Sequence, residues 1–385
     1  MFPRSVADAI KEAKQMQRKP TKAVVLFEDD PTLLRTRKAQ LEKAFGKVVP
    51  ITPFESNVLL AGGPDVPLEQ KLASTLESAR FHHGVIGLIV CDMALERYGA
   101  SQATSSTVVS AAAEALGVPI CLYEAGDKGP LFSLDRRRKW GKGLIIVDEN
   151  SESFGRECAG LYHGFCHIER ELAKIPAKDF AKSMPAEILA RILEKPEETD
   201  RIALYGAGEQ SPLSELLPYY DARRRNILEL RKRFHRALGN WLYTSILRFP
   251  GIAVNEIAAA SYLNISRKDF DRPGVQSIFS KAAYRGPFFE CGRWWWRRGL
   301  DAMLAAARCR TGLEYAGKRG MKGLKPSACS EGSRPHAAGY YCMITEAPVC
   351  EEHSRGGISW FPGGADLARV SRRQYEKMGP FMGLY

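Results

Sequence analysis

Short apolar runs alternate with amphipathic, helix-length segments along the first 150 residues. Strands are predicted for residues 23–27, 48–51, 85–91, 118–122 and 144–147. Helices are predicted between them for residues 31–45, 68–80 and 105–116. Because strand and helix alternate at this spacing, the sequence predicts an α/β domain with a doubly wound, parallel, five-stranded sheet.

Carboxylates stand directly after two of these apolar runs. Glu28 and Asp29 follow the first predicted strand, and Asp92 follows the third. Parallel strands bring their carboxyl ends to one edge of a sheet, which is where α/β folds bind ligands. Three carboxylates there would repel one another unless a proton or a hard cation lay between them, and oxygen-ligated Mg²⁺ suits such a group.

With its acidic strand ends, the segment 22–150 resembles the receiver domain of bacterial response regulators. The resemblance implies that Glu28 and Asp29 hold Mg²⁺ together with Asp92, and that the backbone carbonyl of Ala94 completes the metal shell. It also implies that Asp92 is the phosphoacceptor, whose carboxylate attacks phosphorus in line while Mg²⁺ neutralises charge.

Two positions depart from the receiver pattern. Tyr123 or Glu124 stands where the family has a small hydroxyl residue after the fourth strand, and Asp148 stands where the family has a lysine after the fifth. A carboxylate in place of an ammonium removes a phosphate contact and adds repulsion. Two interpretations therefore stay open, a working phosphoacceptor and a receiver that has kept only the fold.

Length and composition indicate a cytoplasmic protein of two or three domains. The chain has 385 residues, of which 45% are hydrophobic, and no apolar stretch approaches the roughly 20 residues that cross a bilayer. The N-terminal residues 1–22 are charged and lack a secretory core. Nine thinly spread cysteines argue against a disulfide framework. We therefore expect a cytoplasmic protein with no membrane partner, of undetermined oligomeric state.

Charge is concentrated in the last part of the chain. Residues 223–385 carry 28 Lys and Arg against 13 Asp and Glu, a net charge of +15. We expect a receiver-like domain at 22–150, a helical linker region at 151–222, a basic helical domain at 223–310 and a Cys/His module at 311–385. A basic region of this size suits a polyanion, nucleic acid first, although a solubilising surface explains the charge equally well.

The segment 252–270 resembles a helix-turn-helix. Residues 256–263 are predicted to be the first helix, and Ser266 is predicted to cap the second. Side chains of this second helix that would face DNA are Arg267, Lys268 and Arg272. The alternative is an αα-hairpin inside a helical domain.

An unusual run of three tryptophans, 294–296, is flanked by basic residues. Arg293, Arg297 and Arg298 could stack on the indole rings or hold phosphates. The alternative, which the composition favours, is a packed seam in which tryptophan is buried and arginine binds carboxylates.

The C-terminal cysteines and a histidine have spacing that suits a metal. Twelve residues separate Cys329 from Cys342, seven separate Cys342 from Cys350, and two separate Cys350 from His353. Three thiolates and an imidazole would form a closed structural Zn²⁺ site, with His336 competing for the place of Cys329. Reduced buried cysteines are the alternative.

The pair His163 and His167 offers only two ligands on one helical face and is a weaker candidate. Further helices are predicted in this mainly helical part, at 153–175, 184–193, 221–247, 300–308 and 364–378.

Three functions compete. The first is an atypical response-regulator-like protein, in which a receiver-like input, served by a sensor kinase or another regulatory protein, controls a basic DNA-binding output. The second is a non-catalytic adaptor that uses a degenerate receiver fold to bind proteins. The third and least favoured is a metal-dependent phosphate ester hydrolase, because the only nearby acid or base candidates are His82 and His83.

Overall fold

The structure is a computed structural model and describes most of the chain. The described residues are 22–54, 66–83, 85–95, 105–124, 130–149, 153–206, 213, 227–332 and 337–382, with the side chains of 47, 79–83, 130–133, 141, 227–229 and 380–382 excepted. Two compact units are present. The first comprises Met1–Glu124 and Glu149–Ala159, and the second comprises Ala125–Asp148 and Gly160–Tyr385. The four-part division expected from the sequence stays a prediction.

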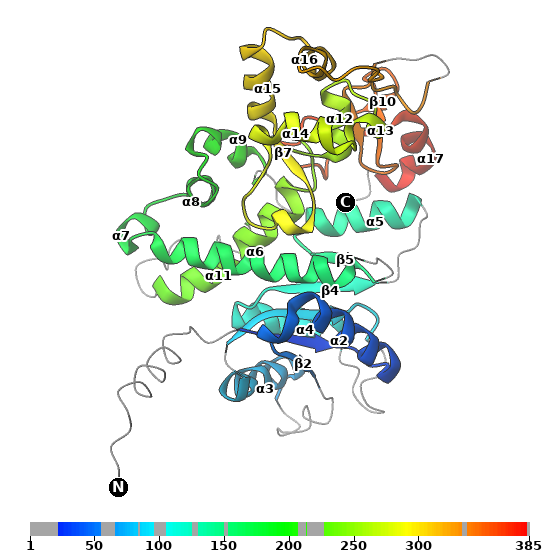
Figure 1. The fold of residues 1–385 in the computed structure, drawn as a ribbon. Coiled ribbons are helices and arrows are strands. Elements are labelled where there is room, and N and C mark those ends of the chain that lie inside the picture. Colours follow the sequence, from blue (N-terminus) through cyan, green and yellow to red (C-terminus); the bar gives the residue numbers. More distant parts are fainter. Residues whose placement is uncertain are drawn as a thin grey trace. The chain divides into compact units, whose positions relative to one another are not determined.

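A five-stranded parallel sheet forms the centre of the N-terminal α/β part. Its strands are β1 (Ala23–Phe27), β2 (Ile51–Pro53), β3 (Ile86–Asp92), β4 (Ile120–Glu124) and β5 (Ile146–Asp148). Their order is β2-β1-β3-β4-β5, so the carboxyl ends of β1 and β3 are neighbours. This order is compatible with a receiver-like fold, and the predicted α/β class is confirmed (Figure 1).

Helices of the first unit follow the predicted pattern closely. They are α2 (Pro31–Phe45), α3 (Leu68–His83) and α4 (Ser106–Leu116). Asp30 caps α2 by accepting hydrogen bonds from the N–H groups of Thr32 and Leu33, and Gly117 ends α4 in the left-handed conformation at φ 62°. Alternate residues of β1, β3 and β4 point to one side of the sheet, where they form a buried core with α3 and α4.

Two sequence predictions in this unit were wrong in detail. The second strand is Ile51–Pro53 rather than 48–51, because Val48 lies in a 3₁₀ turn and is 73% exposed. The predicted apolar stripe of α2 included Leu33, which is exposed, while Arg37 is buried. The buried side of α2 thus includes the Arg37 guanidinium and not the Leu33 side chain.

The second unit is mainly helical, as predicted. Its longer helices are α5 (Pro130–Gly141), the part of α6 (Phe154–Lys174) from Gly160 onward, α8 (Pro185–Ile192), α11 (Ile227–Trp241), α15 (Arg297–Ala306) and α17 (Arg372–Met382). Its shorter helices are α7 (Ala177–Phe180), α9 (Thr199–Leu204), α12 (Glu256–Tyr262), α13 (Arg267–Phe270), α14 (Pro273–Ile278) and α16 (Gly312–Lys318). A π-helical segment, Leu242–Ile246, continues α11.

Two small sheets complete this unit. The first pairs β6 (Ala253–Asn255) with β7 (Trp294–Trp296) in antiparallel register. The second has the order β10-β11-β8-β9 and consists of β8 (Tyr340–Cys342), β9 (Ala347–Val349), β10 (Ser354–Arg355) and β11 (Ala368–Ser371). Residues 368–371 were predicted to be helical but pair with β8, because Val370 is fully buried on this sheet.

The segment 252–270, which resembles a helix-turn-helix in sequence, has the expected capping. Asn264 occupies the left-handed region at φ 54°, and the Ser266 hydroxyl accepts the N–H of Asp269 at the start of α13. The second helix is one turn long, because Arg272 has an extended backbone and a separate helix, α14, begins at Pro273. None of the described helices is long and apolar enough to cross a membrane.

Candidate functional site

Glu28, Asp29 and Asp92 converge at the carboxyl edge of the sheet, as predicted. One carboxylate oxygen from each residue lies within 4.8 Å of the others. The pairing of β1 with β3 produces this approach, because it sets Phe27 beside Cys91 and so brings the next residues of both chains together. We refer to these three residues as the acidic cluster. Its oxygens are the ligand type that Mg²⁺ prefers.

Glu28 is the most buried member of the acidic cluster, at 3% exposure. Its Oε1 accepts the N–H of Asp30 at 3.0 Å, and its Oε2 accepts the hydroxyl of Tyr123 at 2.7 Å. Burial raises the pKa of Glu28 above its ordinary value of 4.5, although both hydrogen bonds act in the opposite direction. The carboxylate is therefore held in position at an energetic cost that a cation would reduce.

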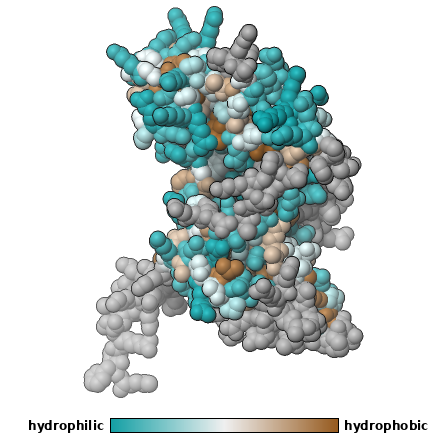
Figure 2. Space-filling model, turned by 90° about the vertical axis from the view of Figure 1, so that its right-hand side faces the viewer, coloured by the Kyte–Doolittle hydropathy of each residue, from teal (hydrophilic) through white to brown (hydrophobic). Residues whose placement is uncertain are grey.

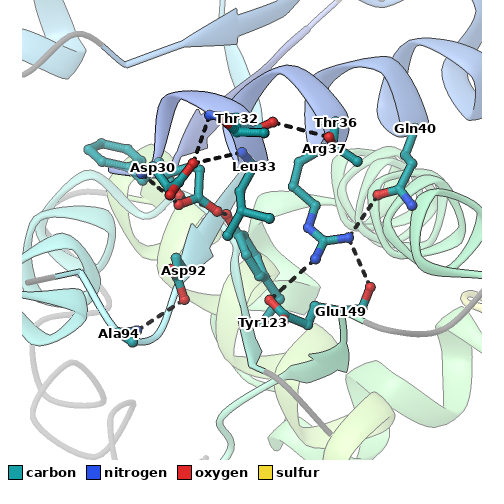
Figure 3. A network of polar contacts seen from close by, with 12 residues as sticks. Asp30, Thr32, Leu33, Thr36, Arg37, Gln40, Asp92, Ala94, Tyr123 and Glu149 are labelled. Atoms are coloured by element: carbon teal, nitrogen blue, oxygen red, sulfur yellow. Dashed lines mark hydrogen bonds and ion pairs between the residues drawn. The ribbon is translucent and has the colours of Figure 1, made fainter.

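Asp92 is half-buried at the end of β3. Its Oδ1 accepts the N–H of Ala94 at 3.0 Å, so the turn after the strand orients the carboxylate (Figure 3). Burial raises the pKa of Asp92 above 3.8, and the charges of Asp29 and Glu149 raise it further. The Ala94 carbonyl as a metal ligand stays a prediction.

Tyr123 occupies the position of the missing small hydroxyl residue. Its ring is fully buried, and its hydroxyl lies against Phe27 O as well as Glu28. Burial and the charge of Glu28 raise the pKa of Tyr123, so the phenol stays protonated and donates to Glu28. The sequence left Tyr123 and Glu124 as alternatives; the structure assigns the contact with the acidic cluster to Tyr123.

Arg37 is a contact residue that sequence reasoning missed. Its guanidinium donates to Glu149 O at 2.9 Å and to Gln40 Oε1 at 3.0 Å, and it pairs with Glu149 Oε2 at 3.3 Å (Figure 3). It also lies over the rings of Tyr123 and Phe154. Arg37 thereby packs against the ring of Tyr123, whose hydroxyl donates to Glu28.

No model of a known protein family matches this sequence, and no curated protein is detectably similar to it. The candidate site therefore rests on its own geometry.

The six predicted nucleic-acid-binding residues lie in the second unit, and most contact protein acceptors. Arg267 pairs with Asp271, Arg272 with Asp269, Arg293 with Glu256 and Arg297 with Asp366; Arg298 donates to Glu197 O, and Lys268 is exposed. Arg267 and Arg293 line a cavity of about 210 Å³ that Arg137 and Arg248 also line. Two carboxylates, Glu256 and Glu346, offset part of its positive charge.

The three tryptophans are packed inside the second unit. Trp294, Trp295 and Trp296 form β7 and are each at most 8% exposed. The Trp294 indole N–H donates to Leu247 O at 2.7 Å. These contacts match the packed seam that the sequence left as an alternative to base stacking.

On the face in Figure 2, hydrophilic side chains cover most of the described surface at the top of the view, where α15 and α16 lie.

Three of the four predicted zinc ligands come together. Cys329, Cys350 and His353 place ligand atoms within 4.8 Å of one another, and we refer to them as the Cys–His trio. Cys342 does not join them: its Sγ accepts the N–H of Ser371 at 3.3 Å. The expectation of Cys342 as a third thiolate ligand is corrected by strand pairing, because β8 places this side chain in the core beside β11.

The remaining histidines add no cluster among the described residues. His163 pairs with Glu290 through Nδ1 at 2.7 Å and lines a cavity of about 270 Å³ together with His167 and Cys166. His336 and the side chains of His82 and His83 lie outside the described part of the chain.

Proposed function

We propose that the first unit is a receiver-like regulatory module that binds Mg²⁺ at the acidic cluster and regulates a basic output region. The observation that carries the proposal is the approach of three carboxylate oxygens from two strand ends to within 4.8 Å. At such separations the charges repel strongly in a partly buried site, and a divalent cation removes that repulsion. Occupation of the cluster would then shift the balance between conformations of the protein.

Asp92 is the proposed phosphoacceptor within this module. One Asp92 oxygen would attack the phosphorus of a phosphoryl donor, the new P–O bond would form in line with the departing oxygen, and the leaving group would depart with its electron pair. Mg²⁺ held by Glu28 and Asp29 would neutralise the charge that collects on the phosphoryl oxygens.

A second candidate is a non-phosphorylated adaptor, and a specific contact favours it. The hydroxyl of Tyr123 is engaged by Glu28 at 2.7 Å, and Asp148, not lysine, ends β5. Both features weaken phosphoryl binding while leaving the cation site intact. The adaptor would bind Mg²⁺ without accepting a phosphoryl group.

Mg²⁺ titration tests the cation site. The melting temperature of the full chain should rise with added Mg²⁺, with a stabilisation of about 2.7 kcal/mol once Mg²⁺ reaches 100 times its Kd. Asp29→Asn and Asp92→Asn should abolish the rise, whereas Glu42→Gln on the exposed side of α2 should keep it. An unchanged melting temperature of the wild-type protein would refute the proposal.

Acetyl phosphate and beryllofluoride separate the two candidates. A working phosphoacceptor gains the mass of one phosphoryl group in Mg²⁺ and acetyl phosphate, with acetate as leaving group, and Asp92→Asn does not. Mg²⁺ binding with no phosphoryl gain and no response to beryllofluoride would establish the adaptor instead.

Titration with labelled duplex DNA tests the basic output. Affinity should fall steeply between low and high salt, because each neutralised phosphate releases counterions. Lys268→Ala combined with Arg267→Ala should reduce the salt slope by about 2, one for each lost phosphate contact, while Lys182→Ala, an exposed lysine of the same unit, should leave it unchanged. No binding at low salt would exclude the DNA-binding output.

A further inference from the structure

The Cys–His trio has the geometry of a metal site that is independent of the acidic cluster. The Nδ1 of His353 lies 3.1 Å from the Sγ of Cys350 and 3.8 Å from the Sγ of Cys329. We infer that the trio binds one Zn²⁺ ion through two sulfurs and one nitrogen. Both cysteines are 7% exposed and are free thiols.

These separations fit tetrahedral zinc. With Zn–S bonds of about 2.3 Å and Zn–N bonds of about 2.0–2.1 Å, two tetrahedral ligands lie about 3.5–3.8 Å apart. The two sulfur–nitrogen distances of the trio are 3.1 Å, which is shorter than this range, and 3.8 Å, which is at its upper end. Small side-chain rotations therefore suffice to enclose the ion.

Hydrogen bonds of the backbone hold the trio in position. The N–H of Cys350 donates to the Sγ of Cys329 at 3.3 Å, which orients that sulfur. The carbonyl of Cys350 accepts the Ser354 hydroxyl at 2.6 Å, and the carbonyl of His353 accepts the N–H of Arg372 at 2.9 Å. The ligands are thus fixed by the surrounding backbone as well as by their own side chains.

The ligand set has two sulfurs, not the three that the sequence predicted. Cys342 is fully buried, and its Sγ is engaged by the N–H of Ser371. Among the described residues, no other Cys, His, Asp or Glu joins the trio. The fourth coordination position of the ion is therefore filled by a lighter ligand atom, oxygen or nitrogen.

Zinc at this position would connect the ends of two strands of the small sheet with the segment that contains Cys329. Cys329 precedes the undescribed residues 333–336, Cys350 directly follows β9, and His353 directly precedes β10. The strands are only two to four residues long, and the core they share is small. Such a module gains much of its stability from a bound ion, which indicates a structural role.

Metal analysis and X-ray absorption of the full-length protein, purified without chelator, test the inference. We expect about one zinc per chain and a first shell of two sulfurs and two lighter atoms. Less than about half an equivalent, with no uptake of added Zn²⁺, would overturn the site. A first shell of three sulfurs would overturn the proposed ligand set and restore Cys342.

Variants provide a second readout. Cys329→Ser, Cys350→Ser and His353→Ala should each lower zinc content at least fivefold, while Cys342→Ser and the distant Cys309→Ser should retain it. Circular dichroism identifies any variant that fails to fold, and the absorption spectrum of the wild-type protein decides the ligand set in that case. A Cys329–Cys350 disulfide, detected by mass after alkylation of the freshly purified protein, would also overturn the inference. Because these residues belong to the second unit, failure of the zinc site would leave the Mg²⁺ proposal untouched.

Discussion

The Tyr123 hydroxyl donates a 2.7 Å hydrogen bond to Oε2 of Glu28, and both groups are buried. This contact joins the carboxyl end of β4 to that of β1. It satisfies one carboxylate oxygen and leaves the phenol with no proton to offer a phosphoryl group. The contact lowers the pKa of Glu28, which suits the proposed cation site, and it occupies a proton that the proposed phosphoryl transfer would use.

Replacing Tyr123 with phenylalanine removes the donor and keeps the ring. A buried carboxylate that loses a hydrogen bond costs about 1–3 kcal/mol, so we expect Tyr123→Phe to destabilise the first unit by this amount at neutral pH. Hydrogen exchange of the β1 and β3 amides measures the effect in that unit directly.

Tyr375→Phe is the matched control, because the described contact of Tyr375 is with Arg355 over the face of its ring, which phenylalanine retains. The tyrosine bond lowers the pKa of Glu28, so the deficit of Tyr123→Phe should shrink in acid, where Glu28 is protonated. A deficit equal at both pH values would show that the hydroxyl does not act on the charge of Glu28.

Acidic pH should stabilise the first unit relative to a variant without the Glu28 charge. The folded-state pKa values of Glu28 and Asp92 are raised above 4.5 and 3.8, so the folded state binds more protons than the unfolded state above these values. Their contribution is therefore full below the ordinary pKa values and is lost as pH rises through the raised ones. Wild-type stability should fall more steeply than that of Glu28→Gln as pH increases from about 4.5 to 7.5.

Hydrogen exchange without Mg²⁺ measures the dependence of stability on pH for the wild type and for Glu28→Gln. The glutamine side chain retains an oxygen that can accept the hydrogen bond from Tyr123. Added Mg²⁺ should restore the wild-type protein at neutral pH and leave Glu28→Gln much less affected. Glu42→Gln, which changes an exposed carboxylate, should follow the wild-type slope. Parallel slopes for Glu28→Gln and the wild type would contradict the assigned pKa direction.

Much of the fold could be predicted because its signals are local. The helix Pro31–Phe45 begins after an Asp cap and was predicted at its observed bounds, and α4 ends at Gly117 as its sequence indicated. Apolar runs identified β1 and β3, and the acids after them identified the cluster. These features depend on residues within a few positions of one another.

Contacts between distant segments could not be predicted. Arg37 has the sequence context of a surface cation, and only the approach of Glu149, 112 residues away, explains its burial. The register of β8 beside β11 likewise decides that Cys342 faces Ser371. Spacing alone could identify the cysteines as candidates but not select among them.

Arg37 and Lys38 offer a comparison between a buried and an exposed ion pair on one helix. Arg37 pairs with Glu149 at side-chain exposures of 7% and 18%, whereas Lys38 pairs with Glu42 at 40% and 55%. Arg37→Met should cost about 3 kcal/mol, because it leaves the half-buried Glu149 without this partner and removes support from Tyr123. Lys38→Met should cost less than about 0.5 kcal/mol.

A double-mutant cycle with Glu149→Gln isolates the coupling of the buried pair. Exchange of the β4 amides reports the stability, and a coupling as small as that of Lys38 with Glu42 would show that burial does not strengthen the Arg37 interaction.

Two helical glycines of the second unit should respond to alanine in opposite directions. A Cβ on Gly164 in α6 would lie 2.1 Å from Cδ1 of Phe288, whereas a Cβ on Gly317 in α16 would meet nothing within 4 Å. Phe288 cannot easily move, because its ring packs edge-on against Phe165 and Tyr243 and its backbone is left-handed at φ 69°. Overpacking should make Gly164→Ala destabilising by about 1–2 kcal/mol despite the better helix propensity of alanine.

Gly317→Ala should instead stabilise the protein by about 0.5–1 kcal/mol, since alanine loses less backbone entropy in a helix. Thermal unfolding monitored by tryptophan fluorescence compares the two variants, because Trp241, Trp294, Trp295 and Trp296 are all buried in this unit. If Gly164→Ala were as stable as the wild type, Phe288 would have room to shift, and the close approach of α6 to the Phe288 turn would not be a packing constraint.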